Sequence, residues 1–207
     1  AYVNGFYSGD GCFTDQGQRI YLYGEKRKLS KFFDHGGKWT IQDNLDRQYN
    51  HFKTLKDKFF VPSSGYTVKS RLEWLAGYLD ADGCVYRCGS NEQLVGSSIE
   101  KNFLREVQMM LQTLGVSAKI TKMADEGFKM LPANDGTGEM KSFWCQDAYR
   151  LLITSCDAYK LQGMGLKLNR LKVTAQKPQR DAKQFVKVVE ILDEGRYDDT
   201  YCFTEPK

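Results

Sequence analysis

The sequence has no long hydrophobic run, no closely paired cysteines and only two histidines. No stretch approaches the ~20 apolar residues that cross a bilayer, and no signal peptide is visible, so we expect a soluble intracellular protein. The six cysteines are scattered without a CxxC pair, which is typical of free thiols in a reducing compartment. With so few histidines, a zinc site would need Cys84 and Cys88 together with distant ligands, and we do not expect one.

The overall composition restricts the fold and the partner only loosely. A chain of 207 residues suits one domain or a pair of small ones and is long enough to bury a core. The net charge of +4 is compatible with a polyanionic partner, but many proteins that bind none are equally basic. The chain opens inside a helical pattern without a methionine, so we expect it to be cut from a longer protein.

The stretch Leu72–Gly83 predicts a helix that is buried on more than one side. Its apolar residues recur at helical spacing: Leu72, Trp74, Leu75, Tyr78 and Leu79. Gly77 and Ala81 share one face, where small residues let a second helix come close, although Gly costs about 1 kcal/mol relative to Ala in a helix. Asp80 and Asp82 stand at the helix end, where the macrodipole disfavours a carboxylate. Function explains such acids better than folding does.

A fainter copy of this stretch opens the chain at Val3–Gly11. Laid on the central copy, it keeps the small pair, as Gly5 and Gly9, and the penultimate acid, as Asp10. Two such helices packed through their small faces would bring Asp10 and Asp82 side by side. Like charges that close raise each other's pKa unless a cation lies between them, so the pattern indicates a divalent metal.

The nine residues Leu75–Gly83, LAGYLDADG, resemble the signature of the LAGLIDADG homing endonucleases and depart from it only at Tyr78 and Leu79. The resemblance implies an α+β fold of two pseudo-symmetric αββαββα half-domains packed through paired signature helices. It also implies a monomeric, site-specific double-strand DNA endonuclease that hydrolyses phosphodiester bonds with Mg²⁺ or Mn²⁺. Two structural helices packed through glycines, with acids that only cap them, remain the alternative.

The local patterns agree with a repeated order of elements. In the first half they predict strands over 12–15, 19–23, 38–42 and 47–53, and helices over 25–34 and 55–60. In the second half they predict strands over 84–88, 93–97, 118–123, 143–146 and 149–154, and helices over 100–114 and 157–163. Residues 125–139 are rich in Gly, Asp and Asn and predict a long loop. We therefore expect half-domains at 1–66 and 67–176.

The C-terminal segment 177–207 has a different pattern and predicts a short β extension. Residues 187–191 and 197–206 resemble late strands of an intein splicing domain, while the terminal residues that splicing needs are missing. The residues around both signatures resemble those of inteins hosted by ribonucleotide reductase. The resemblance therefore implies the endonuclease part of an intein, cytoplasmic and encoded by a bacterium or a phage.

The resemblance also implies which residues form the active site. Asp10 and Asp82 would hold the metals, with the main-chain carbonyls of Gly9 and Ala81 as helpers. Asp80 has the weaker claim because Ser8 stands at its position in the first copy, so we expect it to cap or to bond the partner helix. Lys58 is the expected catalytic cation of the first half, close to the metals. Lys167 is favoured in the second half, with Lys172 as its rival.

We expect the strands to read a long, largely asymmetric DNA site through every second side chain. The candidates in the first half are Arg19, Tyr21, Tyr23, Lys38, Thr40, Gln42, Arg47, Tyr49 and Lys53. Those in the second half are Tyr86, Cys88, Lys119 and Thr121. Two other functions stay open: a maturase-like or regulator-like relative that binds DNA without cutting it, and a module that only splices.

Overall fold

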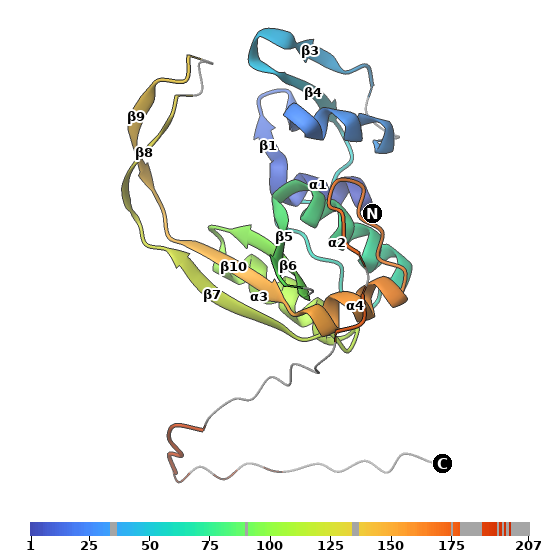
Figure 1. The fold of residues 1–207 in the computed structure, drawn as a ribbon, viewed down its shortest axis with the longest axis vertical. Coiled ribbons are helices and arrows are strands. Elements are labelled where there is room, and N and C mark those ends of the chain that lie inside the picture. Colours follow the sequence, from blue (N-terminus) through green and yellow to red (C-terminus); the bar gives the residue numbers. More distant parts are fainter. Residues whose placement is uncertain are drawn as a thin grey trace.

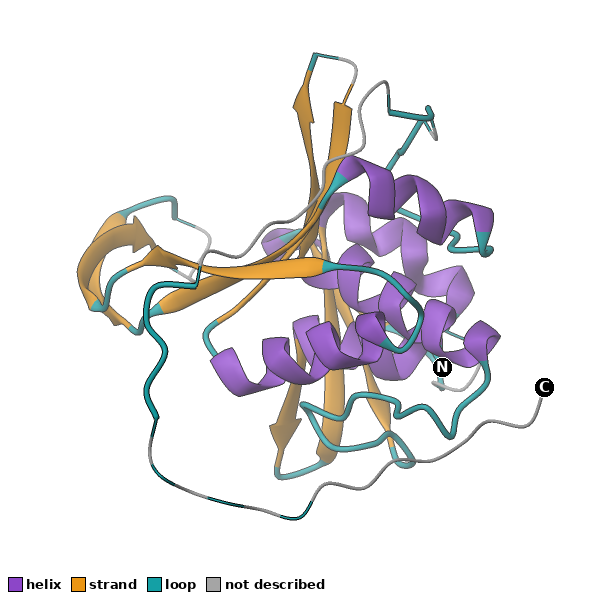
Figure 2. Ribbon diagram, turned by 90° about the horizontal axis from the view of Figure 1, so that it is seen from below, coloured by secondary structure: helices purple, strands orange, loops and turns teal. Residues whose placement is uncertain are grey.

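The computed structural model describes residues 1–33, 37–89, 91–133, 137–174, 176–178 and 188–193, and residues 195, 197 and 199. Helices and antiparallel sheets alternate along the chain, as the α+β prediction requires. Figure 2 shows the helices gathered into one cluster with the strands along its side. Within the described residues no helix is long and apolar enough to cross a membrane.

The first half of the chain runs from a signature helix into a four-stranded sheet. Its elements are α1 (Tyr2–Asp10), β1 (Gly11–Thr14), β2 (Gly17–Tyr23), the 3-10 helices η1 (Gly24–Phe32) and η2 (Asp43–Leu45), β3 (Thr40–Gln42) and β4 (Arg47–Phe52). The strands lie in the order β1-β2-β4-β3. Ile20, Leu22 and Phe52 point from the sheet into a core shared with Phe6 of α1.

The second half repeats this plan with longer elements (Figure 1). They are α2 (Val68–Asp82), β5 (Gly83–Cys88), β6 (Asn91–Ser98), α3 (Lys101–Gln112), β7 (Ala118–Ala124), β8 (Gly127–Pro132), β9 (Met140–Cys145), β10 (Ala148–Ile153) and α4 (Ser155–Gly163). The main sheet has the order β5-β6-β10-β7, and β8 and β9 form a separate two-stranded ribbon. Leu94, Leu151 and Ile153 turn the inner face of the sheet toward the core under α2 and α3.

The two signature helices pack side by side through their glycines, as the small-residue pattern predicts. A Cβ on Gly5 would overlap the carbonyl oxygen of Trp74, and one on Gly77 would overlap that of Tyr2. Further along, a Cβ on Gly9 would lie 2.5 Å from the Cβ of Ala81. The two backbones are therefore in direct contact, and any larger side chain at these points would force them apart.

Several element predictions are wrong in detail. The long loop predicted over 125–139 contains β8, because the Gly, Asp and Asn residues cluster near the tip while Phe128–Pro132 keeps strand alternation. The helix predicted over 55–60 is absent, so the first half lacks its last helix. Its main-chain N–H groups bind side chains instead: Leu55 donates to Gln18 Oε1, and Lys56 donates to Asn4 Oδ1. The helix predicted over 25–34 is a 3-10 helix that ends at Phe32.

The predicted C-terminal β extension is not formed by the residues that the structure describes in this segment. Residues 188–193 have no strand, and Val188, Val189, Ile191 and Leu192 are largely exposed because no neighbouring strand covers them among the described residues. The second predicted strand, over 197–206, lies mostly outside the described residues.

Candidate active site

Each signature helix passes straight into a strand, and an aspartate occupies each junction. Asp10 ends α1 and Asp82 ends α2, and the next residue, Gly11 or Gly83, begins a strand with extended backbone angles. Gly is required at both junctions by close approach, since a Cβ on Gly11 would overlap the Tyr7 carbonyl and one on Gly83 the Leu79 carbonyl. The two acids are thereby held at the same end of the paired helices, as predicted.

The carboxylate of Asp82 lies against the partner helix. A Cβ on Gly9 would stand 3.0 Å from Asp82 Oδ2. Burial and, to a smaller extent, the charge of Asp10 raise the pKa of Asp82 to about 6, against the opposing effect of Lys26, Lys58 and Arg170. The two carboxylates therefore repel each other, which is the electrostatic situation that a cation between them would relieve.

Lys26, a residue that the sequence did not single out, neutralises Asp10. Its Nζ lies 2.5 Å from Asp10 Oδ2, and both side chains are mostly covered. Lys26 belongs to η1, which follows β2 and returns to the end of α1. Neither spacing nor periodicity marks this lysine among its neighbours Arg27, Lys28 and Lys31, so only the fold identifies it.

Lys58 reaches the end of α1 from the irregular segment after β4. Its Nζ donates to the carbonyl oxygens of Tyr7, at 2.9 Å, and Gly9, at 2.5 Å. Burial lowers the pKa of Lys58, and the charges of Asp82 and Asp10 oppose that shift. The sequence-based expectation that Lys58 reaches the junction of the two helices therefore agrees with the structure, although the helix expected to carry it is missing.

Arg170 occupies the matching place at the end of α2. Its Nη2 donates to the carbonyl oxygens of Leu79, at 3.1 Å, and Gly83, at 2.6 Å, and its Nε donates to that of Asp80 at 2.5 Å. In the alignment of the two signatures, Leu79 corresponds to Tyr7 and Ala81 to Gly9. Arg170 also lies 3.5 Å from the Ala81 carbonyl, so Lys58 and Arg170 cap equivalent turns.

Lys167 and Lys172 do not take this position, in contrast to the expectation for the second half. Lys167 lines a cleft at the opposite end of the helix pair, together with Tyr2 and Leu72. Lys172 is exposed, and its carbonyl accepts a hydrogen bond from Arg87. The sequence could not show which of Lys167, Arg170 and Lys172 reaches the helix end, because the chain after α4 is irregular and has no side-chain periodicity.

The side chain of Asp80 fixes the main chain at Arg170. This side chain is fully buried and accepts hydrogen bonds from the Tyr2 hydroxyl of α1, at 2.8 Å, and from the main-chain N–H groups of Asn169 and Arg170, at 2.8 and 3.0 Å. The hydrogen bond to the partner helix that was expected for Asp80 is present, whereas the alternative role, helix capping, is not, because the N–H groups that it binds lie in the irregular segment after α4. Ser8, its counterpart, donates only to the carbonyl of Asn4 in its own helix.

The helper role expected for the carbonyls of Gly9 and Ala81 meets competition from these cations. The Gly9 oxygen accepts from Lys58, and the Ala81 oxygen faces Arg170. Among the described residues no group of three or more His, Cys, Asp or Glu side chains is arranged to hold a metal ion. What fits a divalent cation is the carboxylate pair itself, because Asp82 is buried beside a second negative charge.

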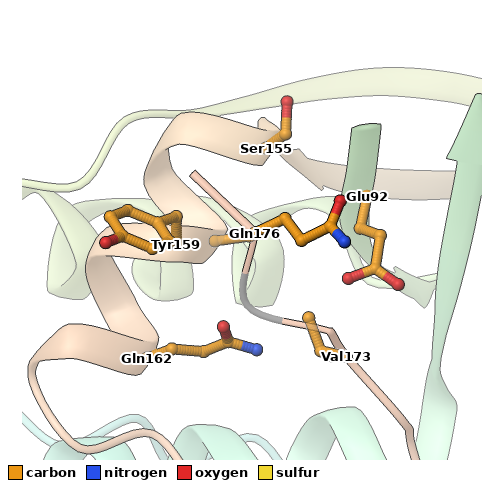
Figure 3. Close-up of a pocket in the computed structure, with 7 residues that line it drawn as sticks. Glu92, Ser155, Tyr159, Gln162, Val173 and Gln176 are labelled. Carbon is orange, nitrogen blue, oxygen red and sulfur yellow. The ribbon is translucent and has the colours of Figure 1, made fainter. Parts of the chain in front are cut away.

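A pocket of about 330 Å³ connects this junction to the second sheet. It is lined by Gly9, Lys58 and Asp82 on the helix side and by Met123 and Ala148 on the sheet side. The outer face of that sheet, the one turned away from the core, therefore lies on the same side of the molecule as the acids. A smaller pocket lies beside α4, where Glu92 and Gln176 point toward each other (Figure 3). Neither Asp10 nor Asp82 lines it.

Apart from Cys88, whose side chain lies outside the described residues, the strand residues predicted to read DNA lie on the outer faces of both sheets wherever they belong to a strand. In the register of β2 and β4, Arg19 lies opposite His51, Tyr21 opposite Tyr49 and Tyr23 opposite Arg47. The side chains of these residues point to the face away from the buried Ile20 and Leu22. Thr40 and Gln42 share this face through their partners on β4. In the second sheet, Tyr86, Lys119 and Thr121 alternate with core residues in the same way.

Three of the predicted DNA-reading residues are less well placed. Lys38 and Lys53 are exposed but lie outside β3 and β4. Cys88 ends β5, and its side chain lies outside the described residues. Sequence reasoning missed His51, Gln93 and Arg150, which the strand registers put on the same outer faces. All three lie within strands that the sequence predicts, so applying the alternation to every residue of those strands would have found them.

The outer face of the first sheet is a network of arginines and tyrosines. The guanidinium of Arg19 lies 5.0 Å from the ring of Tyr49 and donates to the Tyr21 hydroxyl at 2.8 Å. Arg47 lies 4.9 Å from the ring of Tyr21 and donates to Gln42 Oε1 at 2.6 Å. These contacts hold cationic side chains in fixed positions on an exposed sheet surface.

Comparison with known proteins agrees with this fold. Residues 69–163 match the model of the LAGLIDADG-like domain. The chain is 42% identical, over 207 residues, to the ribonucleoside-diphosphate reductase large subunit of Invertebrate iridescent virus 6, covering 99% of this chain and 21% of that protein. It is 23% identical, over 255 residues, to the ribonucleoside-diphosphate reductase NrdEB subunit alpha of Bacillus subtilis (strain 168), covering 99% and 23%. The chain thus spans about a fifth of the length of the curated relatives it matches.

Solved structures with a similar arrangement include the N-terminal LAGLIDADG domain of DUF199/WhiA, with a TM-score of 0.50, 15% identity, and coverage of 80% of this chain and 81% of that one. Another is I-DmoI in complex with DNA and Ca, with a TM-score of 0.44, 14% identity, and coverage of 83% and 90%. Two signature helices packed through glycines, two sheets of matching strand plan and the matched domain model lead to one assignment. Residues 69–163 form a LAGLIDADG-like domain.

Proposed function

We propose that this protein is a site-specific double-strand DNA endonuclease that acts as a monomer, with half-domains at 1–66 and 67–176. The observation that carries the proposal is the convergence of Asp10 and Asp82 at one end of the paired helices, with Asp82 buried beside a like charge. A structural acid would be expected to find a cationic or hydrogen-bonding partner of its own, as Asp80 does and as Asp10 does in Lys26. Asp82 is instead buried beside the charge of Asp10, and it is therefore the acid that chiefly supports the proposal.

Asp10 and Asp82 would hold Mg²⁺ or Mn²⁺. A bound divalent ion would supply a water activated for attack and would neutralise charge on the scissile phosphate. The raised pKa of Asp82 favours its role, because the energy that burial costs is recovered when a cation binds its carboxylate. The carboxylate of Asp10 would then bind both Lys26 and the ion, or Lys26 would release the Asp10 oxygen so that the ion could bind it.

Lys58 and Arg170 would act on the phosphate rather than on the bases. Both are anchored to carbonyl oxygens at the helix ends, so their charges are fixed within reach of the acids. Fixed cations near a developing negative charge stabilise the transition state without reorganising. The outer faces of the two sheets would read the duplex, with Arg19, Arg47 and Lys119 among the contacts.

The relatives suggest where such an enzyme would act. The chain matches a segment of two ribonucleoside-diphosphate reductase large subunits along nearly its whole length. We propose that it is the endonuclease part of an intein within such a reductase, and that its target is the reductase gene without the insertion.

A second function, DNA binding without cleavage, is favoured by one specific observation. Lys26, Lys58 and Arg170 already neutralise the helix ends, which would stabilise the fold in the absence of a metal. In that case the acid pair would be a remnant, and the sheets alone would carry the function.

Plasmid cleavage separates these functions. A plasmid carrying the uninterrupted reductase sequence is incubated with the protein and Mg²⁺, and an unrelated plasmid serves as the control. We expect a single double-strand cut in the first plasmid only. The Asp82→Asn variant should bind the same duplex with a similar dissociation constant and cut neither plasmid. Specific binding by the wild-type protein without cleavage in Mg²⁺ or Mn²⁺ would establish the second function.

A further inference from the structure

The ribbon formed by β8 and β9 has one face without a single charged side chain. In the strand register Phe128 lies opposite Trp144, Met130 opposite Ser142 and Pro132 opposite Met140. We call these six residues the apolar face. The large ones are open to solvent, with exposures of 74% for Phe128, 58% for Met130, 50% for Met140 and 58% for Trp144. An exposed apolar surface of this kind usually marks a binding site.

The opposite face of the ribbon is different in character. It carries Lys129 opposite Phe143 and Leu131 opposite Lys141, so apolar and basic side chains alternate there. Two acids at the base of the ribbon are already paired, since Lys122 lies 2.7 Å from Asp125 and 2.8 Å from Asp147. Lys122 therefore offsets part of the negative charge at the base of the ribbon, where Glu126 is also exposed just before β8.

The ribbon begins beside the pocket that contains Asp82. Ala148, the first residue of β10, lines this pocket. Only residues 146–147, which belong to no strand, separate Ala148 from the end of β9. In Figure 1 the ribbon stands clear of the helices and arches toward the side of the molecule where β3 and β4 lie.

We propose that the ribbon is a DNA-binding arm whose apolar face contacts bases directly, with the Phe128–Trp144 pair as its anchor. The proposal rests on the function proposed above and extends it to one flank of the target duplex. Two-stranded ribbons fit the major groove, where thymine presents a methyl group. Exposed aromatic and methionine side chains also enter opened base steps. The rings of Phe128 and Trp144 meet edge to face with centroids 5.1 Å apart, which gives the anchor a fixed shape.

This kind of contact has a distinctive signature in solution. Phosphate contacts release counterions, so each one steepens the dependence of affinity on salt. The apolar face carries no charge and should contribute affinity that salt does not alter. Removing it should weaken binding without changing the slope, whereas removing a phosphate-binding lysine should lower the slope by about one.

The test compares two double variants of the full chain on the duplex that the wild-type protein cuts. Phe128→Ala with Trp144→Ala removes the anchor, and Leu131→Ala with Phe143→Ala removes apolar side chains from the opposite face of the same ribbon. Dissociation constants are measured by fluorescence anisotropy over a range of salt. We expect the first pair to weaken binding by roughly 10- to 100-fold at every salt concentration, and the second by less than about threefold. Thermal melts should be alike.

A direct probe uses the fluorescence of Trp144, which is exposed, whereas Trp74 is buried and Trp39 is half-buried. The duplex should protect the wild-type protein from iodide quenching and should have a much smaller effect on Trp144→Phe. Equal losses in both double variants, unchanged binding in the first, or a changed salt slope would overturn the proposal. Self-association of the wild type that the first pair abolishes would instead identify the face as an interface between copies. Failure of the wild type to bind any duplex would refute the proposed function itself.

Discussion

In the first half of the molecule the cation above the helix end comes from Lys58, in an irregular segment after β4, whereas in the second half it comes from Arg170, in the segment after α4. Both side chains bind the carbonyls of equivalent turns. The anchoring differs: the main chain before Lys58 is bound by the neutral amide side chains of Gln18 and Asn4, while the main chain around Arg170 is bound by the buried carboxylate of Asp80. A fold can therefore keep a charge in place at two related sites while the supporting residues diverge.

The outer faces of the two sheets differ in the same way. The first sheet holds Arg19 and Arg47 within a network of tyrosine rings. The second has a single hydrogen bond of this kind, from Arg150 to Thr121 at 2.9 Å, among its described outer-face residues, and extends into the β8–β9 ribbon instead. One half presents a rigid polar surface and the other a longer, more apolar one, so the two halves should not contribute equally to binding.

The largest effect is expected where the two halves meet. Gly77→Leu should prevent folding or lower the free energy of unfolding by more than about 3 kcal/mol, since the new side chain would overlap the backbone of α1 and neither helix can move away. Circular-dichroism melts measure this change. Gly163→Leu is the matched control, because a Cβ at this helix end meets nothing within 4 Å. A normal melt for Gly77→Leu would mean that the helices do not touch at that point.

A large effect on rate is expected from the cation of the first half. Lys58→Met should lower the single-turnover cutting rate by about 10²- to 10³-fold and leave the dissociation constant for DNA nearly unchanged. The control is Lys56→Met, whose side chain is exposed and whose loss should change both quantities little. If Lys58→Met weakens binding and spares the rate, the residue is a phosphate clamp.

A moderate effect on stability distinguishes the two signatures. Asp80→Asn should lower the free energy of unfolding by about 2–4 kcal/mol, because a fully buried carboxylate with several N–H and O–H donors would be replaced by an amide that satisfies fewer of them. Ser8→Ala should cost less than about 1 kcal/mol, since Ser8 makes a single hydrogen bond to its own helix. Urea titrations compare the two, and equal costs would contradict the asymmetry.

The last effect is a gradual pH dependence that belongs to Asp82. Its pKa is about 6 in the folded protein and 3.8 ordinarily, so the folded state binds the proton more tightly. The stability from this group is present below about pH 4 and is lost as the pH rises through about 6, by roughly 3 kcal/mol in all and by at most about 1.4 kcal/mol per pH unit. Unfolding in EDTA measures this loss. Asp82→Asn should flatten the profile, and Asp10→Asn should shift it to lower pH by removing the like charge.

The sequence predicted the helix pair and its acids because these depend on short, local patterns. Small residues four apart have no use in a helix except close packing, so Gly5 and Gly77 identified the contact. Strand alternation put Tyr21 and Lys119 on the outer faces. Residues on irregular chain could not be placed by periodicity: Lys58 was found through the family resemblance, whereas Arg170 was passed over for Lys167 because no periodicity orders the stretch after α4. Lys26 was missed because its partner, Asp10, lies far away in sequence and is brought close only by the return of η1.

The direct passage from each signature helix into a strand has a further consequence. Gly11 and Gly83 leave no loop between the acids and the first strand of each sheet. In the proposed enzyme the distance from the cut to the bases that are read is therefore set by the backbone itself and has a fixed value. Substitutions on the strands would change which bases are preferred, but an inserted residue at the junction would be needed to move the cut relative to them.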